Sequence, residues 1–361
     1  MNDRQTVLEI NIENFKHNIK EVKKLVGSKE IMYVMKANAY GTYLNKNIDV
    51  IKDFRIIGVA IVKEAIELRR LGFKGEIFLL NQPYIEDIEN IIKYDVTVGV
   101  ADYCFIKELC KNNNKFRVHL EIETGMGRTG ININELDKVL DLLKESSNIT
   151  VEGIYTHLAV ADSDLSFTLQ QMDIFKNAVS KIKLVFPNIK YIHAEASNGI
   201  QNINDSFCNL VRPGMILYGY NTTNRPKYKL DLKPVAVLKS KISFVKEVPI
   251  NTSISYGRTF ITKRESKIAT VGIGYADGIR RILSNNGRVV VNNKVANIVG
   301  TICMDSFMID VTDVDNVKCG DEVYIWDNNL ITLDEIASNS NTINYEILST
   351  ISNRVPRKFI D

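Results

Sequence analysis

The sequence predicts an α/β fold in which a TIM (β/α)8 barrel precedes a smaller, mostly β domain. Between about residues 10 and 220, short β-rich runs alternate with longer amphipathic stretches, as in a parallel sheet covered by helices on both faces. Near residue 225 the pattern changes to short alternating strands separated by turn residues. The 361 residues are enough for both parts. We expect the barrel over 1–228, with the first residues able to join the second domain, and a C-terminal domain over 229–361.

About eight strand candidates occupy the first part of the chain, which is the number in a closed barrel. Helical patterns lie between them, for example at 63–73, 134–145 and 169–186. A doubly wound open sheet is the alternative that this alternation leaves open. The strand candidates are residues 32–37, 56–61, 76–80, 96–100, 116–123, 151–158, 191–197 and 209–219.

The second part has the short strands and turn residues of an antiparallel sheet. A strand pair over 288–300 contains Asn292-Asn293 at its centre, and asparagine is favoured in tight hairpin turns. Cys319-Gly320 precedes a further strand candidate, and 331–351 adds one or two short helices.

Composition and charge exclude several classes of function. The net charge is +3, and Lys and Arg are scattered among Asp and Glu, so no basic stripe indicates nucleic-acid binding. No apolar run approaches the roughly 18 residues of a membrane span, and residues 1–15 lack the apolar core of a signal peptide. We therefore expect a cytoplasmic protein without nucleic-acid or membrane partners. The five cysteines and four histidines have no metal-site spacing, so we expect no metal.

Lys36 follows an apolar strand candidate in the run Tyr33-Val-Met-Lys-Ala-Asn-Ala-Tyr40-Gly41. The active sites of TIM barrels lie at the C-terminal ends of strands, and a desolvated lysine amine has a lowered pKa and can bond covalently to a carbonyl carbon. Taken alone, however, such a lysine is more often a strand-end residue that emerges into solvent.

Gly125, Gly127 and Gly130 form a G-x-G-x-x-G pattern after a strand candidate. This pattern favours a second hypothesis, an NAD-dependent oxidoreductase. Three features oppose it, of which two are that the preceding strand ends in Glu121-Ile-Glu and that Arg128 interrupts the glycine turn. No acidic strand end follows at the expected distance.

Several further motifs carry polar or glycine-rich turns. Arg212-Pro-Gly214-Met215 follows the last strand candidate of the barrel, where phosphate is often bound, and Ser197 ends the strand candidate before it. Each motif in the second domain fits core packing as well as function: Ser-Tyr256-Gly-Arg, Gly-Tyr275-Ala-Asp-Gly and Cys-Met304-Asp305.

Together and in this order, the motifs closely resemble those of alanine racemase, a pyridoxal-phosphate enzyme family, from about Thr6 to Phe359. The resemblance implies an N-terminal barrel, a C-terminal β domain and pyridoxal 5'-phosphate as the cofactor. It also implies a homodimer in which the partner's C-terminal domain completes each active site. The implied substrate is a small amino acid, alanine, with serine or a broader range as the alternative.

The resemblance also assigns roles to individual residues. It implies that Lys36 binds the cofactor covalently and that Tyr256 is the opposing base, supplied across the dimer interface. Arg212 is implied to face the pyridine nitrogen. The implied cofactor-binding residues are Lys36, Tyr40, His157, Ser197, Arg212, Gly214, Met215 and Tyr345. The implied substrate-binding residues are Arg128, Met304 and Asp305.

The chemistry of racemisation accounts for these residue types. A planar carbanion needs one base on each face, here Lys36 and Tyr256. Because both have reference pKa values of roughly 10, the cationic cofactor and Arg128 are needed to favour the deprotonated phenol. Arg212 does not readily give up a proton, so the pyridine nitrogen stays unprotonated, which discourages transamination.

One departure and one retained residue refine the expectation. Glu121 stands where the family often has a carbamylated lysine, so we predict that Glu121 supplies the anion near Arg128 without a carbamate. Tyr345 is retained, whereas related serine racemases tend to have asparagine there, so alanine is favoured. The family's usual role is D-alanine supply for the cell wall. A non-catalytic pyridoxal-phosphate-binding protein is the alternative of a different class, but such relatives lack the second domain.

Overall fold

The computed structural model describes residues 5–223 and 225–361. The chain forms two compact units. The barrel unit comprises Lys16–Ala39 and Tyr43–Lys233, and the β unit comprises the segment that ends at Phe15, Tyr40–Thr42 and Pro234–Asp361.

Eight parallel strands form the barrel unit in the order β8-β7-β6-β5-β4-β3-β2-β9. This order follows the chain without the reversal of a doubly wound sheet. Backbone hydrogen bonds from Asn209 N to Ile192 O (3.1 Å) and from Arg212 N to Glu195 O (2.8 Å) join β8 to β9 and close the sheet. The predicted closed barrel is confirmed, and the open-sheet alternative is wrong. The strands are β2 (Glu30–Val34), β3 (Ile56–Val59), β4 (Glu76–Leu79), β5 (Thr97–Val100), β6 (Phe116–Glu121), β7 (Ile149–Tyr155), β8 (Tyr191–His193) and β9 (Leu210–Val211).

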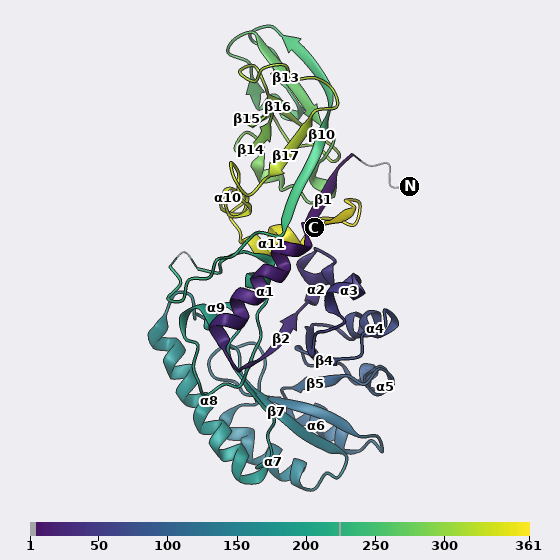
Figure 1. The fold of residues 1–361 in the computed structure, drawn as a ribbon, viewed down its shortest axis with the longest axis vertical. Helices are drawn as coiled ribbons and strands as arrows, with labels where there is room; N and C mark the ends of the chain where they lie inside the picture. Colours follow the sequence, from purple (N-terminus) through teal and green to yellow (C-terminus); the bar gives the residue numbers. More distant parts are fainter. Residues whose placement is uncertain (1–4, 224) are drawn as a thin grey trace. The chain divides into compact units, whose positions relative to one another are not determined.

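Helices follow the strands, and Figure 1 shows α4, α5, α7 and α8 lying outside them. Acidic side chains cap two of these helices: Asp102 accepts from Cys104 N (2.7 Å) and Phe105 N (3.1 Å), and Asp164 accepts from Phe167 N (3.0 Å). The three predicted helices are present as α4, α7 and α8. The helices of this part of the chain are α1 (Ile12–Val26), α3 (Ile48–Ile51), α4 (Val62–Arg70), α5 (Ile88–Lys93), α6 (Tyr103–Cys110), α7 (Leu136–Lys144), α8 (Leu165–Val185) and α9 (Ser197–Asn202).

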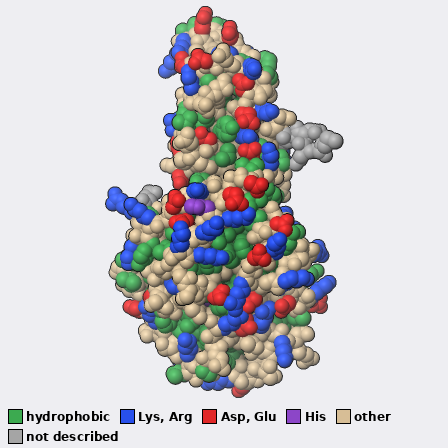
Figure 2. Space-filling view, in the orientation of Figure 1, with side chains coloured by type: hydrophobic (Ala, Val, Ile, Leu, Met, Phe, Trp, Pro, Cys, Tyr) green, Lys and Arg blue, Asp and Glu red, His purple; other side chains and the backbone are tan. Residues whose placement is uncertain are grey.

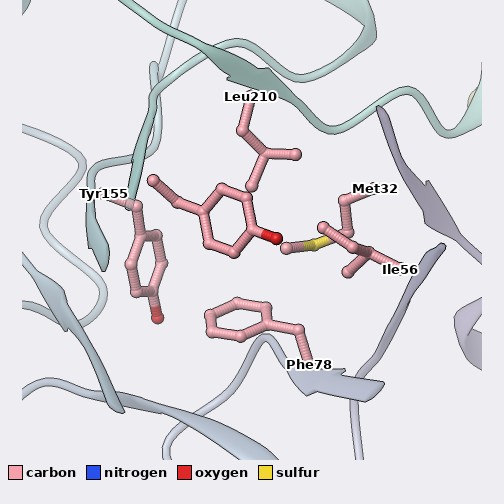
Figure 3. Packing of buried hydrophobic residues seen from close by; sticks show 6 residues of the cluster. Met32, Ile56, Phe78, Tyr155 and Leu210 are labelled. Carbon is pink, nitrogen blue, oxygen red and sulfur yellow. The ribbon is translucent and has the colours of Figure 1, made fainter. Parts of the chain in front are cut away.

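The interior of the barrel is packed with side chains from most of its strands. Figure 3 shows side chains from β2, β3, β4, β7 and β9 converging on one another. All are at most 3% exposed, so the interior is a solid core, and a ligand site is confined to the ends of the strands. The labelled residues are Met32, Ile56, Phe78, Tyr155 and Leu210.

The β unit is a mostly antiparallel sheet with the order β13-β16-β15-β14-β17-β10-β1-β18. The long β10 (Ala236–Val248) pairs with β1, β17 and also β13, so six of the strands close on themselves. Asn292 and Asn293 form the predicted hairpin turn, with φ of 48° and 59°. The other strands are β1 (Val7–Asn11), β11 (Ser253–Ile254), β12 (Phe260–Ile261), β13 (Ser266–Val271), β14 (Arg288–Val291), β15 (Lys294–Val299), β16 (Phe307–Asp310), β17 (Glu322–Trp326) and β18 (Arg357–Ile360).

The predicted short helices of this unit are α10 (Leu333–Asn339) and α11 (Asn344–Ser349). Val248, Ile254, Ile268 and Val299 form a buried cluster in the sheet.

Charged side chains of both signs are interspersed on the face of the molecule that Figure 2 presents. Within residues 5–223 and 225–361, no helix combines the length and the apolar character that crossing a membrane requires.

Candidate active site

Lys36 begins an unusual turn, α2 (Lys36–Tyr40), just beyond the end of β2. Ala37, Asn38 and Ala39 have φ of 52–54° and ψ of 49–53°, and Tyr40 has φ of 55°. Left-handed backbone costs roughly 1–2 kcal/mol for each non-glycine residue. Four such residues in succession persist only where the surroundings hold them, as at functional sites.

The half-buried amine of Lys36 has a perturbed pKa. Burial is the main cause that lowers it, the nearby cation Arg128 lowers it further, and the carboxylate of Glu64 opposes the shift. A lysine with a lowered pKa is a better nucleophile and proton acceptor near neutral pH.

Arg212 lies at the end of β9 and is 3% exposed. Its Nη1 donates to Nδ1 of His193 (2.8 Å), and its Nη2 donates to the carbonyl oxygens of Thr156 (2.8 Å) and Ala194 (3.1 Å). Burial lowers the pKa of the guanidinium. Its Nε donates to no acceptor within the described residues, so it remains available to a ligand.

Two buried histidines continue this chain of hydrogen bonds. Because Arg212 donates to Nδ1 of His193, that ring carries its proton on Nε2, which donates to Nδ1 of His119 at 2.8 Å. Burial lowers the pKa of His119 to about 3 and moves the pKa of His193 well below its ordinary value. Both rings are therefore neutral at pH 7, and the acceptor they present favours the charged guanidinium of Arg212.

His157 follows β7, and its Nδ1 lies 3.4 Å from Nη2 of Arg212. Burial, with Arg212 as the next cause, lowers the pKa of its imidazole to about 3. The buried amide of Gln171 on α8 holds this segment: Nε2 donates to His157 O (3.2 Å) and to Thr124 Oγ1 (3.1 Å), and Oε1 accepts from Ala159 N (2.9 Å).

Ser197, Gly214 and Met215 meet at the loops after β8 and β9. The hydroxyl of Ser197 accepts from Gly214 N at 2.9 Å, so this amide already has an acceptor. The amide of Met215 donates to no acceptor in the part of the chain that the structure describes. The hydroxyl proton of Ser197 and this amide are thus available to an anion.

Glu121 is 2% exposed and accepts from the hydroxyl of Tyr155 at 3.2 Å. Burial raises the pKa of its carboxyl, while the side chain of Thr129, Tyr155 and then the charge of Arg128 lower it. Among the described residues no ion pair joins Glu121 to Arg128, so the role predicted for this carboxylate beside Arg128 stays a prediction.

The glycine pattern forms a turn with its own internal acceptor. Gly125, Gly127 and Gly130 have φ of 127°, 68° and 134°, which explains the three glycines. The amides of Gly125 and Gly127 donate to the carboxylate of Glu123 at 2.5 and 3.0 Å, and α7 begins only at Leu136. A carboxylate on these amides, with no helix starting at the turn, does not fit a dinucleotide pyrophosphate.

In the β unit, Tyr256 begins the turn η5 (Tyr256–Arg258). Thr301 Oγ1 donates to Tyr256 O (2.9 Å), and Ser255 Oγ donates to Thr301 O (2.5 Å). Ser255 has φ of 66°, so these bonds fix a turn that the backbone does not favour. The side chain of Tyr256 is 72% exposed.

Met304 and Asp305 lie on the neighbouring turn of the same unit. Ala276 N donates to Met304 O (3.0 Å), and the Met304 side chain is 52% exposed. Asp305 is exposed and accepts from Arg354 Nη2 at 2.6 Å. Since Ser255 Oγ and Cys303 Sγ are 3.6 Å apart, the structure brings this turn close to the one that carries Tyr256.

Tyr40 and Tyr345 also lie together in the β unit, with ring centroids 6.0 Å apart and planes 59° apart. Burial raises the pKa of Tyr40, and Tyr345 adds to the shift. Gly41 follows Tyr40 and has φ of 79°. Its carbonyl oxygen accepts from Arg357 Nε at 2.9 Å.

The sequence interpretation missed four buried residues that support the site. Glycine inside a strand marks a close approach of another group. A Cβ on Gly153 of β7 would lie 2.6 Å from the His119 ring, and one on Gly99 of β5 would meet the hydroxyl of Tyr155. These glycines were the available signal for the packing around His119. The missed residues are Glu64, His119, Gln171 and His193.

Comparisons with known proteins cover nearly the whole chain. The family models described as alanine racemase, N-terminal domain, and alanine racemase, C-terminal domain, match residues 10–222 and 235–359. Alanine racemase 2 of Caldanaerobacter subterraneus is 40% identical, over 99% of this chain and 95% of its own. The alanine racemase of Halothermothrix orenii is 39% identical, over 99% of this chain and 97% of its own. The structure of the Bacillus anthracis alanine racemase with bound L-Ala-P has a TM-score of 0.92 at 34% identity, covering 99% of this chain and 95% of that one.

Proposed function

Because this chain belongs to the alanine racemase family, we propose that it is a pyridoxal-phosphate-dependent enzyme that interconverts L- and D-alanine. The observation that carries the proposal is the half-buried Lys36 at the end of β2, whose amine pKa is lowered by burial and by Arg128. The names of the relatives support alanine as the substrate.

The residues of the barrel unit fit pyridoxal 5'-phosphate. Lys36 would bond to the aldehyde carbon, and the uncommitted Nε of Arg212 would donate to the pyridine nitrogen. Ser197 and the amide of Met215 would bind the phosphate, with Gly214 holding the serine hydroxyl in place. We also propose that His157 packs beside the ring and that Tyr40 and Tyr345 reach the phosphate. When bound, the cofactor withdraws electrons from the α-carbon of the amino acid.

Arg212 keeps its own proton in this proposal. The neutral His193 and two carbonyl oxygens accept from its Nη atoms, and they favour the charged guanidinium. A donor that does not release its proton leaves the pyridine nitrogen unprotonated. The weaker electron withdrawal that results favours return of a proton to the α-carbon over transamination.

Two bases would move the proton, Lys36 on one face of the α-carbon and Tyr256 on the other. The side chains of Tyr256 and Met304 are 72% and 52% exposed, and a phenol that transfers protons works better where water is excluded. We therefore propose a homodimer in which a second copy of the chain covers this surface and receives Tyr256, Met304 and Asp305 in its active site. Arg128 would bind the substrate carboxylate.

Exchange of the α-hydrogen in deuterated water tests the proposal, with L-alanine, L-serine and other amino acids as substrates. We expect exchange with inversion, fastest for alanine. Fastest exchange for serine would keep the mechanism and favour the serine racemase alternative, which Tyr345 opposes. Bound cofactor without any exchange would favour the non-catalytic alternative.

The physiological role that we propose is the supply of D-alanine for the cell wall, in the cytoplasm. It rests on the family resemblance and on the sequence expectations. Deletion of the coding sequence should then cause a growth requirement for D-alanine.

A further inference from the structure

Glu64 connects the turn of Lys36 to the first turn of α4. One carboxylate oxygen, Oε1, accepts from the amide of Ala37 at 2.6 Å. The other, Oε2, accepts from the amides of Ala60 at 2.8 Å and Ile61 at 3.3 Å. Glu64 is 8% exposed, so water does not readily replace these three bonds.

The bond between Glu64 and Ala37 does more than cap α4, because it reaches the residue next to Lys36. Ala37 directly follows Lys36 and is the first residue of the left-handed run. The amide of Ala37 lies at the start of the turn. The amide of Ala39 closes the turn by donating to Met35 O at 3.0 Å. Since left-handed backbone is unfavourable for alanine, the bond that Ala37 N donates to Glu64 helps to hold the first residue of this run in its conformation.

The same carboxylate is the negative charge that acts on the amine of Lys36. Burial and the cations Arg128 and Arg212 lower the pKa of this amine, and Glu64 raises it. Glu64 is thus connected to Lys36 both through the backbone and through its charge.

We infer that Glu64 is a positioning residue for Lys36: its carboxylate accepts hydrogen bonds on both oxygens, fixes the left-handed turn and so directs the lysine amine toward the bound aldehyde. The inference rests on the proposed function, because it assumes that Lys36 is the residue that bonds to the cofactor.

Covalent labelling of Lys36 provides a readout that does not depend on racemase activity. Full-length protein stripped of cofactor is incubated with pyridoxal phosphate at a series of pH values. The amine condenses with the aldehyde with loss of one water, borohydride then delivers hydride to the C=N bond, and mass spectrometry measures the pyridoxylated Lys36 peptide. The variants are Glu64→Gln, which keeps the length but not the charge, and Glu64→Asp, which keeps the charge but not the reach. Asp102→Asn is the matched control, because Asp102 caps α6 through two amides.

For Glu64→Gln we expect labelling at high pH to slow by about tenfold, as for a misplaced reacting group. We also expect the midpoint of the pH profile to fall by about one unit, because an opposite charge near the amine is lost. Glu64→Asp should be labelled slowly, with the midpoint of its pH profile near that of the wild-type protein. If Glu64→Gln does not fold, the labelling rate of Glu64→Asp tests the inference. Asp102→Asn should change neither quantity.

Normal rates and midpoints in both Glu64 variants would overturn the inference, as would an equal slowing in Asp102→Asn. If the unmodified protein does not label at Lys36, the proposed cofactor attachment fails and the inference fails with it. Labelling of the unmodified protein with unaffected Glu64 variants removes the inference alone.

Discussion

Arg212 and Ser197, candidate groups of the barrel unit, are buried and hydrogen-bonded, whereas Tyr256 and Met304 of the β unit are exposed. Arg212 and Ser197 are 3% and 4% exposed, but Tyr256 and Met304 are 72% and 52% exposed. Side chains hold the barrel groups in place, as His193 holds Arg212. In the β unit, by contrast, a hydrogen bond from Thr301 to the carbonyl oxygen of Tyr256 holds its backbone, and the Tyr256 side chain is exposed.

Because of this difference, we expect substitutions in the two units to affect stability and activity differently. A change at a buried, bonded group leaves partners unsatisfied, so it affects stability as well as chemistry. A change at an exposed group leaves the fold intact, so any loss of activity reports directly on catalysis. Substitutions of buried and of exposed groups test this separation.

Replacing Lys36 by alanine should have the largest effect, because it removes both a base and the attachment of the cofactor. We expect turnover of alanine to fall by roughly 10⁴-fold or more. The absorbance of the lysine-bound cofactor, which borohydride abolishes in the wild-type protein, should be absent. Lys107→Ala, on the exposed face of α6, is the control and should retain activity. Substantial turnover in the Lys36 variant would refute the assigned role.

Tyr256→Phe should lower racemisation by about 10³-fold, since one of two general bases is lost. Because the side chain is exposed, the free energy of unfolding should change by no more than about 0.5 kcal/mol, and Lys36 should still react with the cofactor. Polarimetry of D- and L-alanine and urea unfolding measure the two quantities. A large loss of stability would contradict the contrast between the units.

Arg212→Met should destabilise the protein by about 1–3 kcal/mol for each buried acceptor that it leaves unsatisfied, and Arg212 donates to three of them. An exposed arginine of the β unit, Arg264, which pairs with Asp313, should show a much smaller loss when replaced by methionine. Urea unfolding of the two variants gives the comparison, and similar losses would show that burial does not distinguish the two units.

The buried histidines should make the stability of the protein depend on pH. The pKa of His119 is about 3 in the folded chain, below its ordinary value of 6.5, so the unfolded chain binds more protons between these values. Stability from the neutral ring is therefore present above pH 6.5 and is lost as the pH falls toward 3. His119→Asn, which keeps an acceptor for His193, should reduce the slope of unfolding free energy against pH by about 1.4 kcal/mol per unit in this range. An unchanged slope would mean that His119 is already charged in the fold.

Local sequence patterns predicted many of the strands and helices. The eight barrel strands, three of the helices and the Asn292-Asn293 hairpin follow from hydrophobic periodicity and turn residues, because these signals lie within a few residues of one another. Closure was predicted only from the number of strand candidates, which left an open sheet as the alternative. Bonds such as that from Arg212 N to Glu195 O depend on the twist of all eight strands together.

For the candidate site, the sequence by itself determined which residue types stand at which strand ends, and through the order of the motifs it determined the family. Only the tertiary structure decided how they are held. It shows the left-handed run after Lys36. It also shows the bond from Ala37 to Glu64 and the hydrogen bonds that connect Arg212, His193 and His119, which join residues 19 to 74 positions apart. The physical reason is that burial and hydrogen-bond partners arise when separate strands meet in one core, so no stretch of sequence contains them.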